Sequence, residues 1–205
     1  MDNMDNQPVS CEPVAPQRKP STLIADLLDY IEIFVVAICV VIVLFCLSGI
    51  RLCTVDGPSM EDTLQNNEKL ITSNLFYTPK RGDIVVFHQT SDALNGYNKP
   101  IVKRVIGVAG DTVSIDYQTW TVTVTDKDGN VTVLDEPYRK VVDSNPYPAT
   151  PVSVYVEEGT VFVMGDNRNH SADSRNAKIG LVDTRRILGK VILRITPFDR
   201  FGSVE

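Results

Sequence analysis

The sequence has little cysteine and only two histidines, and this scarcity argues against several classes of function. Its four cysteines are Cys11, Cys39, Cys46 and Cys53, and none of the residues from 54 to 205 is a cysteine. None stands in a CxxC pair or at a spacing to histidine that suits metal ligands. We therefore expect no metal and no cofactor, and a domain after Cys53 that holds together without disulfides.

The chain contains no cluster of five or more Lys or Arg residues. The 20 Lys and Arg are outnumbered by 26 Asp and Glu, which gives a formal net charge of −6. Nucleic-acid binding needs a positive surface that neutralises phosphates. The sequence therefore argues against a DNA or RNA partner. Its length suits one well-buried domain with an appendage.

One segment lacks charge altogether. Residues 33–50 read IFVVAICVVIVLFCLSGI, and a helix of that length spans about 27 Å, close to the roughly 30 Å hydrocarbon core of a bilayer. A buried core helix or a cleaved signal peptide is also apolar. However, the run exceeds the about 7 to 15 residues of a signal h-region and has no clear small-residue exit site. We interpret residues 26–50 as an uncleaved transmembrane anchor helix.

Basic residues near the ends of this anchor indicate its orientation. Arg18 and Lys19 precede it, whereas Arg51 alone follows it closely, and basic residues favour the cytoplasmic side. Residues 1–25, rich in Pro, Asn and Gln, are then a disordered cytoplasmic tail. Residues 51–205 form the extracytoplasmic part of a single-pass protein of the cell membrane, in contact with the lipid bilayer.

The residues after the anchor alternate short β-branched runs with turn residues. Typical runs are KLITSN, DIVVFH, DTVSID, TWTVTVTD and TVFVMG. This texture predicts a mainly β, antiparallel domain. Several prolines and a polar run between Glu136 and Val156 indicate a surface excursion. We expect a small inserted β subregion at approximately residues 112–160.

The stretch VDGPSMEDTL places a lone serine, Ser59, soon after the anchor. A serine hydroxyl becomes a good nucleophile only when a neighbouring group takes its proton. His170 with Asp166 or Asp173 is one candidate for that group, although a lone loop histidine is more often simply solvated. The GxSxG and SxxK motifs of other serine enzymes are absent.

Lys103 is the other candidate base. In the strand pattern IVKRVI, it shares one face with Ile101 and Val105, while Arg104 lies on the opposite face. The pattern alone favours a lysine whose stem snorkels at a sheet edge. Service as a base requires a pKa about 2 to 3 units below the ordinary value of about 10.4, which desolvation can supply. Arg104 points away and is free to meet a carboxylate such as Asp166.

Several segments in the same order resemble the type I signal peptidases, in particular the smaller Gram-positive-type members. The matching segments are VDGPSM with TL, RGDIVVF, VKRVIG with GD, GDNR with SADSR, and a weaker PF with RFG near the C-terminus. Together they cover most of residues 51–202. These proteins are membrane-anchored Ser-Lys proteases that remove signal peptides from exported proteins. The resemblance implies a signal-peptidase-like β domain and the same reaction.

By motif position, the resemblance implies Ser59 as nucleophile and Lys103 as general base. Gly57 occupies the position where some members carry a serine that donates to the oxyanion. The Ser59 main-chain N–H and the Gly57 main chain are then the implied oxyanion hole.

Supporting roles follow from the same motif positions. Ser171 is implied to orient the lysine amine, and Asp166 to form a structural ion pair with Arg104. Asp173 and Arg175 are implied to support their loop.

The family binds its substrate as an added β-strand, with shallow pockets for small side chains, often Ala-x-Ala. Met60, Val55 and Val102 are the positions expected near these pockets, although two core valines are an equally good interpretation. Secretory preproteins, and with them the protein export machinery, are the implied partners.

The chain departs from the family pattern at two places. Glu61-Asp62 replaces the usual x-Pro, and a carboxylate there is expected to raise the pKa of the lysine unless exposure and distance weaken the effect. Asn169-His170 replaces a commoner Asp-Asn, and His170 is assigned no catalytic role. Two alternatives stay open: a Ser-Lys protease with one dedicated substrate, and a catalytically silent, membrane-anchored β module that binds extended peptides.

Overall fold

The computed structural model describes residues 23–47, 49–89, 100–141 and 152–204. The chain divides into two compact units, residues 1–43 and residues 44–205. Each unit is described by itself.

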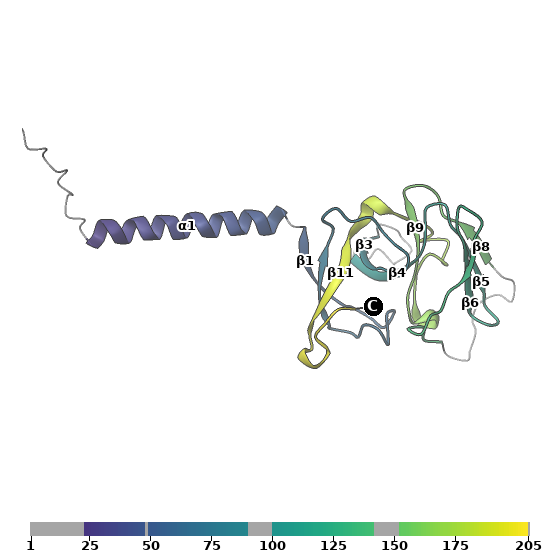
Figure 1. Cartoon of the computed structure of the whole chain (residues 1–205). Helices are drawn as coiled ribbons and strands as arrows, with labels where there is room; N and C mark the ends of the chain where they lie inside the picture. Colours follow the sequence, from purple (N-terminus) through teal and green to yellow (C-terminus); the bar gives the residue numbers. More distant parts are fainter. Residues whose placement is uncertain (1–22, 48, 90–99, 142–151, 205) are drawn as a thin grey trace, which may run out of the picture. The chain divides into compact units, whose positions relative to one another are not determined.

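Helix α1, Leu23–Leu47, carries the apolar run (Figure 1). Its segment Ala25–Leu44 has a mean hydropathy of 2.7 and is not buried by other parts of the structure, so it is long and apolar enough to cross a membrane. The helix ends before the predicted limit at residue 50. Gly49 has a φ of 63°, a conformation typical of the residue that follows a helix. The expected tail, residues 1–25, lies almost entirely outside the described residues.

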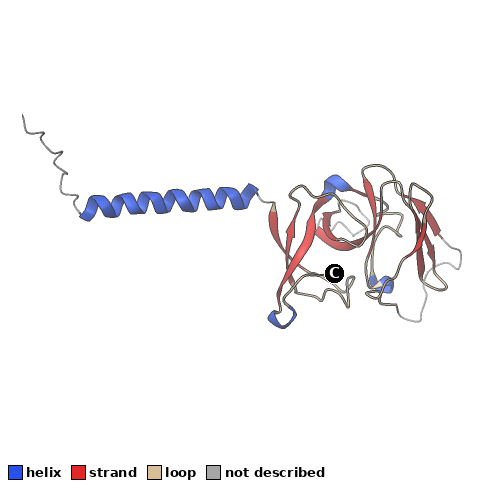
Figure 2. Ribbon diagram, viewed as in Figure 1, coloured by secondary structure: helices blue, strands red, loops and turns tan. Residues whose placement is uncertain are grey.

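The larger sheet contains seven strands, all paired antiparallel (Figures 1 and 2). In spatial order they are β1 (Ile50–Thr54), β2 (Lys69–Ser73), β11 (Ile187–Thr196), β3 (Ile84–His88), β4 (Pro100–Val108), β9 (Thr160–Met164) and β10 (Val182–Asp183). The C-terminal strand β11 is therefore inserted between β2 and β3. Strand β4 lies in the interior of the sheet, with β3 on one side and β9 on the other.

The smaller sheet has the order β7-β6-β5-β8 and is also antiparallel. Its strands are β5 (Thr112–Asp116), β6 (Thr121–Thr125), β7 (Val131–Val133) and β8 (Val152–Tyr155). It lies within the segment for which the sequence indicates an inserted subregion. Short 3-10 helices at Arg168–His170 (η2), Thr184–Arg186 (η3) and Phe198–Arg200 (η4) complete the described elements.

Burial follows two patterns that reflect the position of each strand. In β5 and β6 every second residue is buried, such as Val113 and Val122, because one face packs on the core. In β3, residues 84–87 are all buried, since apolar clusters cover both faces of the central strands. The prediction of a mainly β, antiparallel fold with one N-terminal apolar helix is confirmed.

Candidate active site

Ser59 lies in a loop, residues 56–66, that connects β1 to β2; we call it the Ser59 loop. The β1–β2 ladder continues past Thr54, because Val55 N–H donates to Glu68 O at 2.9 Å. Two buried side chains, Met60 and Leu64, anchor the loop in the core. The serine is thus presented by a loop whose base and apolar side are both fixed.

Asn167 donates hydrogen bonds to the carbonyl oxygens of Pro58 and Ser59. Its main-chain N–H donates to Ser59 O and its Nδ2 donates to Pro58 O, each at 3.1 Å. Thr63 Oγ1 donates to Asp166 Oδ2 at 2.6 Å. The sequence motif GDNR therefore contacts the Ser59 loop directly, although sequence reasoning gave Asn167 no role.

Lys103 on β4 reaches Ser59 from the interior of the sheet. Its Nζ lies 2.7 Å from Ser59 Oγ and 2.9 Å from Val102 O, and the residue is only 3% exposed. The interpretation of a lysine that snorkels at a sheet edge is wrong, because β4 is a central strand. An amine in this position has lost most of its hydration.

Loss of solvent is the main reason that the Lys103 amine holds its proton weakly. Burial lowers the pKa of Lys103 to about 8; the carboxylates of Asp173 and Asp166 oppose this shift, and the nearby Arg175 guanidinium adds to it. About half of the molecules then carry a neutral amine near pH 8. A neutral amine beside a hydroxyl can accept its proton.

The basic residue next to Lys103 is paired where the sequence suggests. Arg104 Nε and Nη2 donate to Asp166 Oδ1 and Oδ2 at 2.9 and 2.8 Å. Both residues are buried, and the guanidinium carbon lies 3.8 Å from the centre of the Tyr138 ring. This bidentate pair fixes β4 to the segment after β9, one residue before Asn167.

Asp173 collects the donors of the following loop. It accepts from Ser171 Oγ at 2.6 Å, from Gly165 N–H at 2.9 Å and from Arg175 Nε at 2.8 Å. Burial alone would raise the pKa of Asp173, but the Arg175 guanidinium, the Ser171 hydroxyl and the Gly165 N–H outweigh it and hold this pKa below its usual range. The carboxylate therefore stays ionised in the pH range where Lys103 titrates.

Ser171 lies near the reacting pair, but its hydroxyl points to a carboxylate. A Cβ on Gly165 would lie 2.3 Å from Ser171 Oγ and 2.4 Å from Ser59 O, so both serines approach this glycine closely. Ser171 Oγ donates to Asp173, and within the described ranges Lys103 Nζ is not among its hydrogen-bond partners. Its influence on the lysine therefore runs through Asp173.

The implied oxyanion donors are placed differently from expectation. Gly57 N–H donates to Asn66 Oδ1 at 2.9 Å, so this main-chain donor is already engaged. The Ser59 N–H is left as the main-chain donor of the implied oxyanion hole.

The acidic pair Glu61-Asp62 contacts a surface lysine. Lys140 Nζ lies 2.9 Å from Asp62 Oδ1 and 3.6 Å from Glu61 Oε2. Asp62 is also 78% exposed, and neither carboxylate is among the charges that shift the pKa of Lys103. Lys140 and solvent therefore screen this pair, which is the weakening by exposure that the sequence left open.

The residues expected at the substrate pockets separate into two groups. Val55 lines a groove of about 580 Å³ together with Cys53, Asp56 and Pro100, among others. Val102 packs on the same apolar cluster as Val55. Met60 is 1% exposed and belongs to the core, so it offers no surface to a substrate and instead supports the loop from below.

His170 is exposed at the end of η2. The only hydrogen bond found for it in the described chain joins its main-chain N–H to Asn167 O. The Ser-His-Asp alternative is therefore not assembled, since Ser59 Oγ contacts Lys103 instead.

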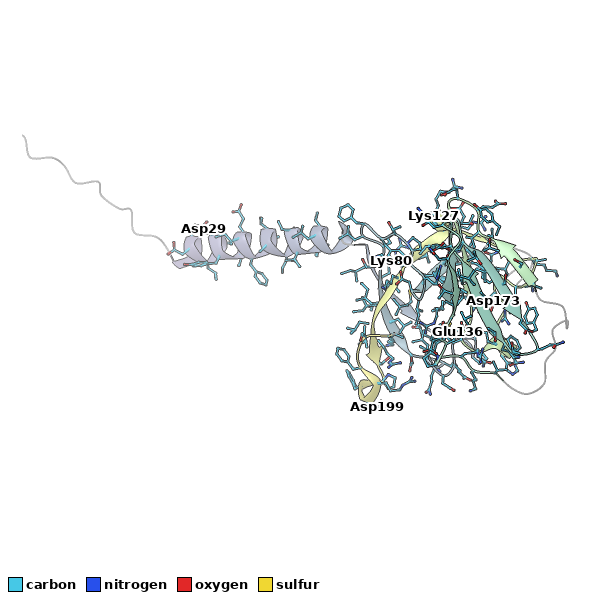
Figure 3. The ribbon with its side chains drawn as sticks, turned by 45° about the vertical axis from the view of Figure 1, so that its right-hand side comes forward. Asp29, Lys80, Lys127, Glu136, Asp173 and Asp199 are labelled. Atoms are coloured by element: carbon cyan, nitrogen blue, oxygen red, sulfur yellow. The ribbon has the colours of Figure 1, made fainter. Side chains whose placement is uncertain are left out.

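Two ion pairs that the sequence analysis did not predict, Arg168 with Glu136 and Arg200 with Glu68, involve residues near the site. Arg168 binds Glu136 through two hydrogen bonds, and both side chains are buried. Figure 3 shows Glu136 and Asp173 within the β unit. Arg200 pairs with the buried Glu68 and donates to Thr63 O. Only the weak C-terminal motif, which contains Arg200, signalled a contact with this region.

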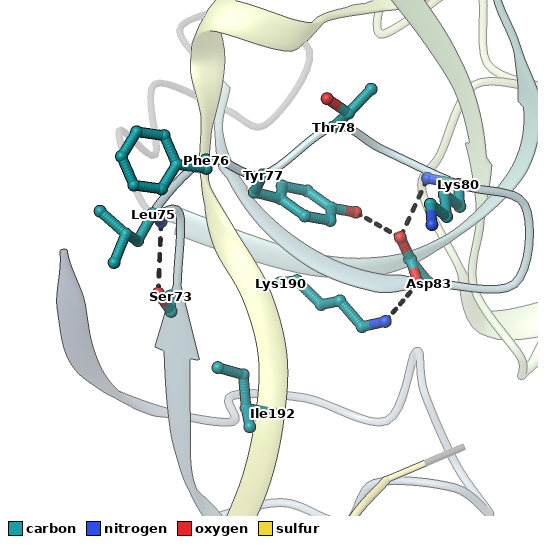
Figure 4. Close-up of a pocket in the computed structure, with 9 residues that line it drawn as sticks. All are labelled: Ser73, Leu75, Phe76, Tyr77, Thr78, Lys80, Asp83, Lys190 and Ile192. Carbon is teal, nitrogen blue, oxygen red and sulfur yellow. Dashed lines mark hydrogen bonds and ion pairs between the residues drawn. The ribbon is translucent and has the colours of Figure 1, made fainter. Parts of the chain in front are cut away.

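A separate cavity of about 430 Å³ contains none of the expected site residues (Figure 4). Asp83 lies in its wall and accepts hydrogen bonds from Tyr77 Oη and Lys80 N–H. Lys190 Nζ lies 2.6 Å from Asp83 Oδ1. Burial would raise the pKa of Asp83, but Lys190, Tyr77 and Lys80 outweigh it and keep this pKa below its usual range. The cluster stabilises the junction of β3 and β11.

The Lys103 geometry predicts a defined pH dependence. If the neutral amine is the base, kcat/KM should rise about tenfold per pH unit at low pH and level off above the pKa. The midpoint is expected near pH 8, since the pKa of Lys103 lies at about 8. Steady-state cleavage of a peptide substrate between pH 5 and 10 measures this. The same midpoint in His170→Ala is the control; a midpoint that disappears in this variant would contradict the assignment to Lys103.

Comparison with known proteins identifies the family. The family model described as signal peptidase, peptidase S26, matches residues 27–196. A probable signal peptidase I-2 from Synechocystis is 36% identical over 157 residues, which cover 72% of this chain and 64% of that protein. Signal peptidase IB from Staphylococcus aureus is 34% identical over 166 residues, which cover 72% of this chain and 78% of that protein.

Among solved structures, a signal peptidase I from Enterococcus faecalis V583 is 29% identical, with a TM-score of 0.41; the match covers 56% of this chain and 97% of that chain. The chain spans somewhat less than two thirds of the Synechocystis protein. A family model matched over most of the sequence and relatives above 30% identity over 72% of it show that this chain belongs to the signal peptidase family, peptidase S26.

Proposed function

We propose that the chain is a serine endopeptidase that removes N-terminal signal peptides from exported preproteins at the outer face of the cytoplasmic membrane. The observation that carries the proposal is the 2.7 Å contact between Ser59 Oγ and the buried Nζ of Lys103. Ser59 is the nucleophile and Lys103 is the general base. Family membership supports the reaction class.

Acylation begins with transfer of the hydroxyl proton from Ser59 Oγ to the neutral amine of Lys103. The oxygen then attacks the carbonyl carbon of the residue before the cleavage site, and the negative charge develops on the carbonyl oxygen beside the Ser59 N–H. The C–N bond breaks when the Lys103 ammonium returns the proton to the leaving amine. The signal peptide remains as an ester on Ser59.

Deacylation uses the same base a second time. Lys103 takes a proton from a water molecule, which attacks the ester carbonyl, and the C–O bond to Ser59 breaks as its oxygen recovers the proton. Asp173 and Asp166 raise the proton affinity of the amine. They therefore stabilise the transient ammonium, while burial favours a resting amine that is neutral and unhydrated.

The substrate is proposed to bind as an added strand beside β1. Strand β1 is the outermost strand at its end of the larger sheet, and an exposed strand edge accepts an extended peptide through main-chain hydrogen bonds. The groove at Val55 and Pro100 adjoins the end of this strand. Small side chains, as in an Ala-x-Ala signal, are the substrate feature that the family resemblance implies for such pockets.

Helix α1 is proposed to anchor the enzyme in the membrane, with the N-terminus in the cytoplasm. Delivery of preproteins to the outer face then makes the export machinery a partner. A protease with a single dedicated precursor uses the same site, so substrate range has to be measured.

The test is cleavage of a signal-peptide-bearing preprotein by the full chain in detergent micelles. Wild type and His170→Ala are expected to cut once, after the signal peptide, and Ser59→Ala is expected to cut nothing. Sequencing of the product N-terminus fixes the cleavage site. If the wild type binds several preproteins without cutting any of them, the silent peptide-binding module is favoured instead. If it cleaves only one of them, a protease with one dedicated substrate is favoured.

A further inference from the structure

We propose that Asn66 is a positioning residue of the active site: it holds the Gly57 N–H and thereby aims the Ser59 N–H at the developing oxyanion. The inference rests on the proposed function. Asn66 stands outside all the motifs that carry the family resemblance, and it closes the end of the Ser59 loop that leads into β2.

The contact extends the β1–β2 ladder by one rung. Val55 N–H donates to Glu68 O and Asn67 N–H donates to Val55 O, each at 2.9 Å. Gly57 N–H then donates to Asn66 Oδ1, also at 2.9 Å. A side-chain oxygen here takes the place of a main-chain carbonyl, so the neck of the loop is closed just before the nucleophile.

The hydrogen bond from Gly57 N–H to Asn66 matters because a glycine backbone is conformationally flexible unless other contacts restrain it. Gly57 has a φ of 96°, and an added Cβ would meet nothing within 4 Å, so neighbouring side chains do not restrict it. Glycine populates many conformations when it is not held. Asn66 is the side chain that holds this residue by a hydrogen bond to its N–H.

Pro58, a rigid residue, connects the hydrogen-bonded Gly57 to Ser59. Pro58 has no N–H and a fixed φ, and its carbonyl is held by Asn167 Nδ2 at 3.1 Å. Pro58 is therefore held at both ends, by Asn66 through Gly57 and by Asn167 directly. The next N–H along the chain is that of Ser59, so the two asparagines set its direction.

Three variants separate this role from its alternatives. Asn66→Ala removes the acceptor, and kcat is expected to fall about tenfold, less than the 10² to 10³ for a lost oxyanion donor, because the Ser59 N–H is displaced but still present. KM should change less than about twofold. Asn66→Asp keeps an acceptor oxygen but lacks the amide donor, and is expected to stay within about threefold of wild type. Asn130→Ala, at a remote turn where Asn130 bonds to Asp126, is the matched control and should leave kcat unchanged.

An independent readout follows the bond itself. Hydrogen exchange at the Gly57 amide should accelerate in Asn66→Ala and stay slow in Asn66→Asp, because exchange requires the hydrogen bond to open. The low-pH limb of kcat/KM should not move in either variant if Lys103 keeps its contact with Ser59. A shifted limb would mean that the change acts on that pair instead, and would overturn the proposal.

Two further results would overturn it. Asn66→Ala with more than half of the wild-type kcat excludes a positioning role. Equal losses in Asn66→Ala and Asn66→Asp point to direct donation from Asn66 Nδ2 to the oxyanion. Failure of the proposed function looks different, since wild type would then cleave nothing or Ser59→Ala would remain active.

Discussion

Replacement of Lys103 by methionine is expected to lower kcat for preprotein cleavage by about 10⁴-fold or more, the scale seen when a serine protease loses its base. Lys103 Nζ is the hydrogen-bond partner of Ser59 Oγ in the described chain. Without it the hydroxyl keeps its proton in the ground state, and the leaving amine has no acid. Single-turnover cleavage of a preprotein measures the loss.

Methionine is the sharpest substitution because it separates catalysis from folding. Methionine keeps an unbranched, flexible side chain of similar size at this buried position. The wild type protonates a buried amine below pH 8, and its depressed pKa of about 8 lowers stability there by about 3 kcal/mol relative to an ordinary lysine. Because the pKa of Lys103 is lower in the folded protein than the ordinary value of 10.5, the loss of stability is complete below about pH 8 and disappears as the pH rises toward 10.5. Lys103→Met should therefore unfold at a higher temperature than wild type at pH 7.

The matched control is Lys127→Met, which removes an exposed lysine of the β6–β7 turn (Figure 3). This variant should retain the wild-type kcat and the wild-type melting temperature. A Lys103→Met enzyme with more than a tenth of the wild-type rate would show that another group takes the Ser59 proton.

Replacement of Asp166 by alanine is expected to lower the free energy of unfolding by about 3 to 5 kcal/mol, the usual range when one partner of a buried ion pair is removed. Arg104 is only 3% exposed and gives two hydrogen bonds to this carboxylate. The buried guanidinium would lose the carboxylate to which its Nε and Nη2 donate. Thr63 Oγ1 would also lose its acceptor, so the Ser59 loop should loosen and activity should fall.

Denaturant unfolding, followed through the fluorescence of Trp120, the single tryptophan, measures the effect. Asp183→Ala is the matched control, since its partner Arg185 is 88% exposed and solvent already screens that pair. Its free energy of unfolding should fall by only about 1 kcal/mol, the usual cost of losing the N-cap hydrogen bond that Asp183 accepts from the Arg185 N–H. Arg104→Met combined with Asp166→Leu should recover much of the loss, because no unpaired charge remains. Equal unfolding by Asp166→Ala and Asp183→Ala would contradict the buried-pair argument.

Local patterns in the sequence predicted the parts of the fold that depend on near neighbours. An uncharged run long enough for a bilayer predicted α1, and short β-branched runs between turn residues predicted antiparallel sheets. The end of the helix was misplaced by a few residues, because the pattern stayed apolar through Ile50 while Gly49 turned the chain. Hydrophobicity marks burial or membrane contact, and it does not by itself mark where hydrogen bonding changes.

Spacing and resemblance singled out Ser59 and Lys103, but not the setting of the lysine. Alternation along β4 suggested one buried and one solvated face, whereas apolar clusters cover both. This depends on β3 and β9 flanking the strand, which is a matter of pairing between distant segments. The same gap explains why Met60 was expected at a substrate pocket and is found in the core.

By itself the sequence determined the membrane-length helix and the β texture, because these follow from residue type and short spacing; the serine, the lysine and their supporting charges were implied only by the resemblance of several motifs to a known family. The tertiary structure alone decided which donors and charges are already engaged: Gly57 N–H by Asn66, and the Glu61-Asp62 carboxylates by Lys140. Hydrogen bonds and screening act over a few ångströms in space, and residues that are distant along the chain supply them. For the same reason, the burial of Lys103, which lowers its pKa, exists only once segments that are distant along the chain have packed around β4.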